Sequence, residues 1–222
     1  EEGPPSVGAG APPGTLREAL RLPGRFWALT ALWLVYGVTG GTVNTFGAAF
    51  LAETGLDPLR ADRVITWSML GVVPATPLLG WWVDRHGGLH GLLTVCGLLA
   101  GLVLGLLVCR CTEPEPLGVL YGAVLAGIPL AVFLLLPRWV GPARVGLGFA
   151  LVQGAMSIGA LLGPVLAGVL RDRTGTHGWG MRLGVVLVTL TGVIGAGLWI
   201  RCGREGRSPP RGPGIARPLD GS

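Results

Sequence analysis

Residues 89–109 read LHGLLTVCGLLAGLVLGLLVC, an apolar run that contains no Asp, Glu, Lys or Arg. A helix needs about 20 mostly apolar residues to cross the hydrocarbon core of a bilayer. The run does not alternate polar and apolar residues, as a strand of a membrane barrel would. It therefore predicts a membrane-spanning helix.

Five further apolar runs of spanning length occur along the chain, at about 26–51, 64–83, 117–136, 145–170 and 179–200. Short connections between the runs contain most of the charged residues. We therefore expect an all-α polytopic membrane protein whose six transmembrane helices form one bundle over 26–200. The flanking segments 1–25 and 201–222 are rich in Pro, Gly and Arg, and we expect them to be disordered.

The composition of the whole chain excludes other classes of protein. Charged residues make up 13% of the 222 residues, against roughly 25% in a soluble domain, so they cannot cover a globular surface. The apolar content of 50% is too high for a disordered chain,. Arginines are dispersed between the apolar runs and form no basic stripe, so no nucleic-acid partner is expected.

Basic residues predict the orientation in the membrane. All 17 are arginines, and eleven of them fall on the face that contains both termini, against six on the opposite face. The eleven are Arg17, Arg21, Arg25, Arg85, Arg138, Arg144, Arg201, Arg204, Arg207, Arg211 and Arg217. By the positive-inside rule, both termini and residues 84–88 lie in the cytoplasm. We expect the plasma membrane rather than an organelle.

Neutral polar side chains within the spans are the candidates for a solute-binding cavity. No span has an Asp, Glu or Lys near its middle, so the chain offers no obvious proton-carrying carboxylate,. Tyr36, Asn44, Thr76 and Gln153 are the cavity candidates, with a small molecule as substrate. The alternative role for each is a hydrogen bond that holds two helices together.

Catalysis is not expected. Ser157 lies in mid-span, as a nucleophile of a six-helix rhomboid protease would, but a serine nucleophile needs a base within hydrogen-bonding reach. His86, His90 and His177 all fall in or near the connections, away from that depth. The four cysteines have no metal-ligand spacing. No enzyme activity, metal or cofactor is therefore expected.

Small residues recur at four-residue spacing in the third and fifth spans. Without a bulky side chain, two helices can approach closely along such a stripe. Helix packing is the expected role of Gly97, Gly101, Gly105, Gly159, Gly163, Pro164 and Gly168. Prolines interrupt three spans, and each removes a backbone hydrogen bond and bends its helix. They are Pro74, Pro77, Pro129 and Pro164. Bent or broken helices line the cavity of many transporters.

The connection between the second and third spans has the sequence GWWVDRHG at residues 80–87. Gly80 allows close helix approach and Gly87 permits a tight turn. Asp84 can lie at the positive end of a neighbouring helix, and Arg85 can contact a lipid phosphate or a carbonyl. We interpret this connection as a cytoplasmic gating loop.

The ordered pattern of Gly80, Asp84, Arg85 and Gly87 resembles the loop signature of the major facilitator superfamily, without the basic pair that usually follows. Residues 148–154 and 163–175 resemble the eleventh helix of its monocarboxylate-transporter and oxalate/formate-antiporter branch, with Val165 where the second Pro of that pattern stands. Arg25-Phe26-Trp27 and Gly40-Gly41 fit the seventh helix of those relatives.

The resemblance covers about residues 25–200 and implies the C-terminal half of a twelve-helix transporter. Its partners would be the N-terminal six-helix half, the lipid bilayer and a small organic solute such as an organic anion. Monocarboxylate transporters have an Asp and an Arg in the eighth helix, and residues 71–77 here contain neither. That departure argues against proton-coupled monocarboxylate transport. The alternative is a truncated paralogue that serves as a membrane scaffold, ancillary subunit or receptor.

Overall fold

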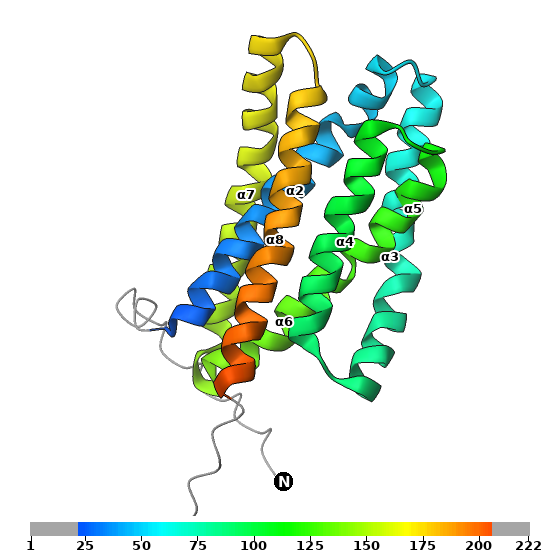
Figure 1. The fold of residues 1–222 in the computed structure, drawn as a ribbon. Helices are drawn as coiled ribbons and strands as arrows, with labels where there is room; N and C mark the ends of the chain where they lie inside the picture. The colour runs from blue at the N-terminus through cyan, green and yellow to red at the C-terminus, as the bar shows by residue number, and fades with distance from the viewer. Residues whose placement is uncertain (1–21, 206–222) are drawn as a thin grey trace, which may run out of the picture.

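The computed structural model describes residues 22–205, which form helices that run up and down through one bundle (Figure 1). The elements are α2 (Gly24–Glu53), α3 (Pro58–His86), α4 (Leu89–Cys109), α5 (Pro114–Leu125), α6 (Gly127–Val140), a 3-10 turn (Pro142–Arg144), α7 (Val145–Thr174) and α8 (Gly178–Glu205). The terminal segments that we expect to be disordered lie for the most part outside the described residues.

Six spans within the described residues are long and apolar enough to cross a membrane, with α5 and α6 together forming the fourth over Pro114–Val140. The expected class, an all-α polytopic membrane protein, is therefore confirmed. The start of α2, the α3–α4 turn and the end of α8 lie at one end of the bundle (Figure 1). The α2–α3, α4–α5 and α7–α8 connections lie at the other end.

The fourth span differs from the single apolar run read from the sequence, because it breaks at Ala126 between α5 and α6. Pro129 explains the break. It has no N–H to donate to the carbonyl of Leu125, and its ring crowds that carbonyl. By contrast, α3 continues as a helix through both of its prolines, and α7 continues through Pro164.

Local signals fix where α3 begins and ends. The side chain of Asp57 accepts hydrogen bonds from the backbone N–H groups of Leu59 (3.1 Å) and Arg60 (3.2 Å), which caps the first turn,. At the other end, Gly87 has φ +68° and Gly88 has φ +82°. This left-handed backbone favours glycine, so the chain turns into α4 within two residues.

Glycines bring α2 and α7 into close contact. A Cβ at Gly159 would collide with the carbonyl oxygen of Leu34, and one at Gly163 would collide with another carbonyl oxygen of α2. On the facing helix, a Cβ at Gly37 would lie 2.5 Å from the carbonyl oxygen of Met156. The two backbones therefore touch along a stripe of glycines, and any larger residue there would push the two helices apart.

The same kind of contact joins α4 and α8. A Cβ at Gly97 would lie 2.5 Å from the Cα of Gly192, and one at Gly101 would collide with the side chain of Thr189. One at Gly105 would make an ordinary 3.7 Å contact with a valine of α8. The contact is therefore tightest at Gly97 and Gly101, and it loosens by Gly105.

Pro164 and Gly168 are also expected at helix contacts, but only Pro164 lies close to another helix. Pro164 lies against α2, since a Cβ at Gly41 would approach its ring to 3.0 Å. A Cβ at Gly168 would meet nothing within 4 Å, so within the described residues this glycine makes no close helix contact. It lies on the open side of α7, about one turn beyond the stripe.

The core draws most of its buried side chains from α2, α4 and α6. Its largest side chains, each at most 2% exposed, include Phe26, Trp33, Leu93, Leu104 and Leu135. α3 and α7 are the least buried spans, with 17% of each apolar window inside the bundle, against 56% for α2 and α4. Broad apolar faces of α3 and α7 are therefore open to lipid or to another helical bundle.

Candidate functional site

A pocket of about 120 Å³ lies between α2, α3 and α5. Its lining combines polar and apolar side chains and contains no ionisable Asp, Glu, Lys or Arg. The lining residues are Tyr36, Thr39, Gly40, Val43, Asn44, Ser68, Met69, Val72, Tyr121 and Leu125. Two of the four cavity candidates, Tyr36 and Asn44, therefore line one pocket. They lie eight residues apart on α2, which places them on the same side of that helix.

Three polar residues line this pocket without having been cavity candidates, namely Thr39, Ser68 and Tyr121, and Tyr121 differs from the other two in its hydrogen bonding. Its side chain is 3% exposed, and its hydroxyl has no hydrogen-bond partner among the described residues. Burying a hydroxyl without a partner costs free energy. The ring of Tyr36 stacks on Trp33 at 4.8 Å, which holds it at the edge of the pocket. The pocket thus contains one buried donor that has no protein acceptor.

The other two cavity candidates lie elsewhere. Thr76 is exposed on α3, and its hydroxyl donates to the carbonyl of Val72 at 2.8 Å. Gln153 is exposed on α7, with its Nε2 3.9 Å from the sulfur of Met156. Neither lines the pocket, because both belong to the open faces of their helices.

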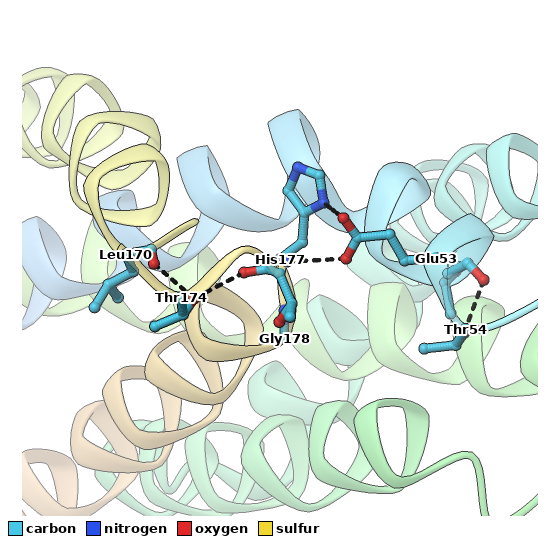
Figure 2. Close-up of polar contacts among 8 residues, drawn as sticks. Glu53, Thr54, Leu170, Thr174, His177 and Gly178 are labelled. Atoms are coloured by element: carbon cyan, nitrogen blue, oxygen red, sulfur yellow. Dashed lines mark hydrogen bonds and ion pairs between the residues drawn. The ribbon is translucent and has the colours of Figure 1, made fainter. Parts of the chain in front are cut away.

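A polar cluster ties α2 to the α7–α8 connection at the end of the bundle away from the described termini (Figure 2). The carboxylate of Glu53 accepts a hydrogen bond from the backbone N–H of His177 at 2.9 Å and lies 2.5 Å from its Nδ1. Thr174 donates to the carbonyl of Leu170 at 2.7 Å, as Figure 2 also shows. We call this contact between Glu53 and His177 the clasp; it connects residues that are 124 positions apart.

A second, wider pocket of about 530 Å³ opens beside this clasp. Its lining includes Glu53 at the end of α2, Thr54 just after it, Arg182 of α8, and Gly175, Thr176 and Gly178 around the α7–α8 connection. The guanidinium of Arg182 lies over the ring of Trp179 at 5.0 Å. This polar hollow has charges of both signs, in contrast to the neutral pocket within the bundle.

The 80–87 connection forms the end of α3 and its turn into α4. Asp84 and Arg85 are exposed, and the guanidinium of Arg85 lies over Trp81 at 5.8 Å. The ring of His86 stacks on Trp82 at 5.3 Å. A Cβ at Gly80 would meet nothing within 4 Å, so within the described residues no helix packs against this glycine.

Six spanning helices, glycine-mediated helix pairs and a small polar pocket between spans define a polytopic helical membrane protein. The chain belongs to the major facilitator superfamily: residues 28–219 match the family model described as Major Facilitator Superfamily. Membership of this family points to a transporter, and the family resemblance expected from the sequence is confirmed.

Individual relatives are more specific. Monocarboxylate transporter 13 of Rattus norvegicus is 33% identical over 132 residues, which cover 58% of this chain and 31% of that protein. Monocarboxylate transporter 11 of Homo sapiens is 33% identical over 190 residues, covering 77% of this chain and 40% of that protein. A multidrug resistance protein B homolog of Mycobacterium tuberculosis (strain CDC 1551 / Oshkosh) is 30% identical over 147 residues, 62% of this chain and 25% of that protein. The chain therefore spans well under half the length of these relatives.

Proposed function

We propose that this chain is the C-terminal half of a secondary active transporter that moves a small organic solute by alternating access. Two six-helix bundles would rock around a site near the middle of the membrane. The observation that supports this most is the neutral pocket between α2, α3 and α5, which contains the unpaired Tyr121 hydroxyl. The names of the relatives favour a monocarboxylate or another organic anion as the solute.

The pocket would bind the solute through neutral hydrogen bonds. Asn44 can offer both an amide donor and an acceptor, and the tyrosine hydroxyls can donate to a carboxylate or carbonyl oxygen. Strong binding of a charged solute also needs a fixed charge at that depth. Because the pocket contains none, we assign the pairing charge to the N-terminal half. Thr76 and Gln153 would face that half from α3 and α7.

The close packing of the helices would let this bundle move as a rigid body. Close backbone contacts hold α2 to α7 and α4 to α8, so relative motion is easier at the open apolar faces of α3 and α7. We assign those faces to the contact with the N-terminal half. Asp84 would then cap a helix of that half as a cytoplasmic gate. Asp84→Asn should reduce transport by the full-length protein at unchanged surface expression, and unchanged transport would make Asp84 an ordinary surface charge.

Solute uptake tests the proposal directly. The full-length product of the gene that encodes this chain is reconstituted into liposomes, and uptake of radiolabelled pyruvate and benzoate is compared with that of protein-free liposomes. We expect saturable uptake that Asn44→Ala weakens by about 2–13-fold in apparent affinity, corresponding to the loss of one neutral hydrogen bond of about 0.5–1.5 kcal/mol. Absence of uptake of these and a wider set of organic anions would contradict it.

The alternative, a membrane scaffold or ancillary subunit without transport, is favoured by the absence of a mid-span carboxylate or ammonium in the six runs. Such a protein would bind a membrane partner and leave solute flux unchanged. If the reconstituted protein gave no flux but co-purified in fixed stoichiometry with another membrane protein, this alternative would replace the transporter.

A further inference from the structure

An apolar groove lies along the seam between α3 and α4, away from the pocket assigned to the solute. It has a volume of about 520 Å³, and its floor includes Ala123 and Val124 at the end of α5. Leu78 of α3 and Val95 of α4 form its lips and are 66% and 51% exposed. Trp82 lines the end nearest the α3–α4 turn. The groove therefore opens to the surroundings of the bundle.

The length of the groove matches one leaflet of a bilayer. On α4 it extends from Gly91 to Leu99, eight residues or about 12 Å at 1.5 Å per residue,. Half of a hydrocarbon core of about 30 Å is about 15 Å. A helix from another bundle would continue past this distance, whereas the acyl chain of a lipid in one leaflet ends there. The dimensions favour an acyl chain as the occupant.

Positive charge lies about one helical turn beyond Trp82, the last groove residue of α3. Arg85 follows Trp82 by three residues, is exposed and forms no ion pair within residues 22–205. The first turn of α4 follows Gly88 and has no side-chain cap, so its free N–H groups add partial positive charge,. Asp84 contributes the turn's one carboxylate. An arginine and an uncapped helix start together suit a phosphate group.

The tryptophans fix the depth of this end of the groove. Trp81 and Trp82 are 60% and 42% exposed at the end of α3. Exposed tryptophans gather at the level of lipid headgroups, where their rings meet both hydrocarbon and water. Arg85 and the start of α4 therefore lie where a phospholipid carries its phosphate.

We propose that the α3–α4 groove binds one anionic phospholipid, with an acyl chain between the two helices and the phosphate at Arg85 and the first turn of α4. Gly91 lines the groove, and a Cβ at this position would meet nothing within 4 Å. A large side chain there would occupy the space of the acyl chain without a collision with the backbone.

Native mass spectrometry of the full-length protein in detergent tests the site, with palmitoyl-oleoyl phosphatidylserine and the matching phosphatidylcholine as probes. We expect the wild type to retain one phosphatidylserine more tightly than phosphatidylcholine. Gly91→Trp should weaken that retention by about tenfold, and Arg85→Gln should do so by about tenfold through loss of a charge-assisted contact. Gly197→Trp on α8 is the matched control, since a Cβ at Gly197 also meets nothing within 4 Å.

Three outcomes would overturn the proposal. Equal retention of phosphatidylserine by the wild type and by folded Gly91→Trp would place the lipid outside the groove. Equal retention by wild type and Arg85→Gln would remove the headgroup contact, and Arg85 is exposed, so this variant is expected to fold. Displacement of the lipid by millimolar glycerol phosphate would indicate a free phosphate site.

Discussion

At the scale of single residues, the Tyr121 hydroxyl offers a test of whether the proposed pocket binds a ligand. Its hydroxyl is buried without a partner, while the equally buried hydroxyl of Thr191 donates to the carbonyl of Val188 at 2.6 Å. A buried hydroxyl without an acceptor destabilises the empty protein, and a ligand or a water in the pocket would relieve that cost. We therefore expect removal of the two hydroxyls to change the stability of the solute-free protein in opposite directions.

Tyr121→Phe should stabilise the protein without solute by about 1 kcal/mol and weaken apparent solute affinity by about 2–13-fold. Thr191→Val, which removes a satisfied hydroxyl, should lower stability and leave affinity unchanged. Thermal unfolding in detergent and uptake kinetics measure the two effects. Loss of stability in Tyr121→Phe with unchanged affinity would assign this hydroxyl to packing.

Glu53 allows a second test at this scale. Its carboxylate accepts from the backbone N–H of His177 and pairs with the ring. Glu53→Ala should destabilise the folded protein by about 1.5 kcal/mol, the lower end for a hydrogen bond to a charged group, because the Glu53 side chain is 35% exposed,. Thermal unfolding measures this, with exposed Asp172→Ala as control. Equal unfolding temperatures for wild type and Glu53→Ala would show that the clasp contributes nothing.

At the scale of helices, much could be predicted from sequence and some could not. The six apolar runs predict the spans, and the glycine stripes that include Gly97 and Gly159 predict close helix contacts, because both are patterns among residues near one another in sequence. Partners that lie far apart in sequence, such as Glu53 and His177, leave no such pattern. Tyr121 was visible as a hydroxyl in an apolar run, but its lack of an acceptor depends on the packing of three helices. Gln153 lies outside the pocket between α2, α3 and α5, and sequence does not reveal which side of α7 is open.

The α2–α7 contact makes a quantitative prediction for helices. Gly159→Leu should lower stability by about 1–3 kcal/mol or more, because its side chain would collide with the backbone of α2 at Leu34,. Gly168→Leu is the matched control on the same helix, since its Cβ would enter open space. Thermal unfolding of both variants in one detergent measures the difference. Equal destabilisation by the two substitutions would contradict the glycine-mediated contact.

At the scale of the whole molecule, the arrangement fits one bundle of a two-bundle carrier. The start of α2, the α3–α4 turn and the end of α8 share one end of the bundle, so a single orientation assigns them all to one side of the membrane (Figure 1). The excess of arginines on that face then predicts the cytoplasm. In the proposed carrier, the open faces of α3 and α7 would contact the second bundle and lipid.

Labelling of single cysteines checks the orientation. In a full-length protein without native cysteines, His86→Cys at the α3–α4 turn should resist an impermeant thiol reagent applied to intact cells. Asp172→Cys, exposed at the opposite end, should react. Permeabilised cells provide the control that both sites are reactive. The reverse pattern would invert the topology.

Alternating access to the pocket is the central claim, and the reactivity of Asn44→Cys tests it most directly. The variant, in a full-length protein without native cysteines, is reconstituted in one orientation and exposed to an impermeant thiol reagent from each side in turn. Thr42→Cys, 1% exposed on the same helix, is the control. We expect labelling of Asn44→Cys from both sides, protection by a transported solute, and no labelling of Thr42→Cys. Labelling from only one side, or labelling that no transported solute slows, would contradict this claim.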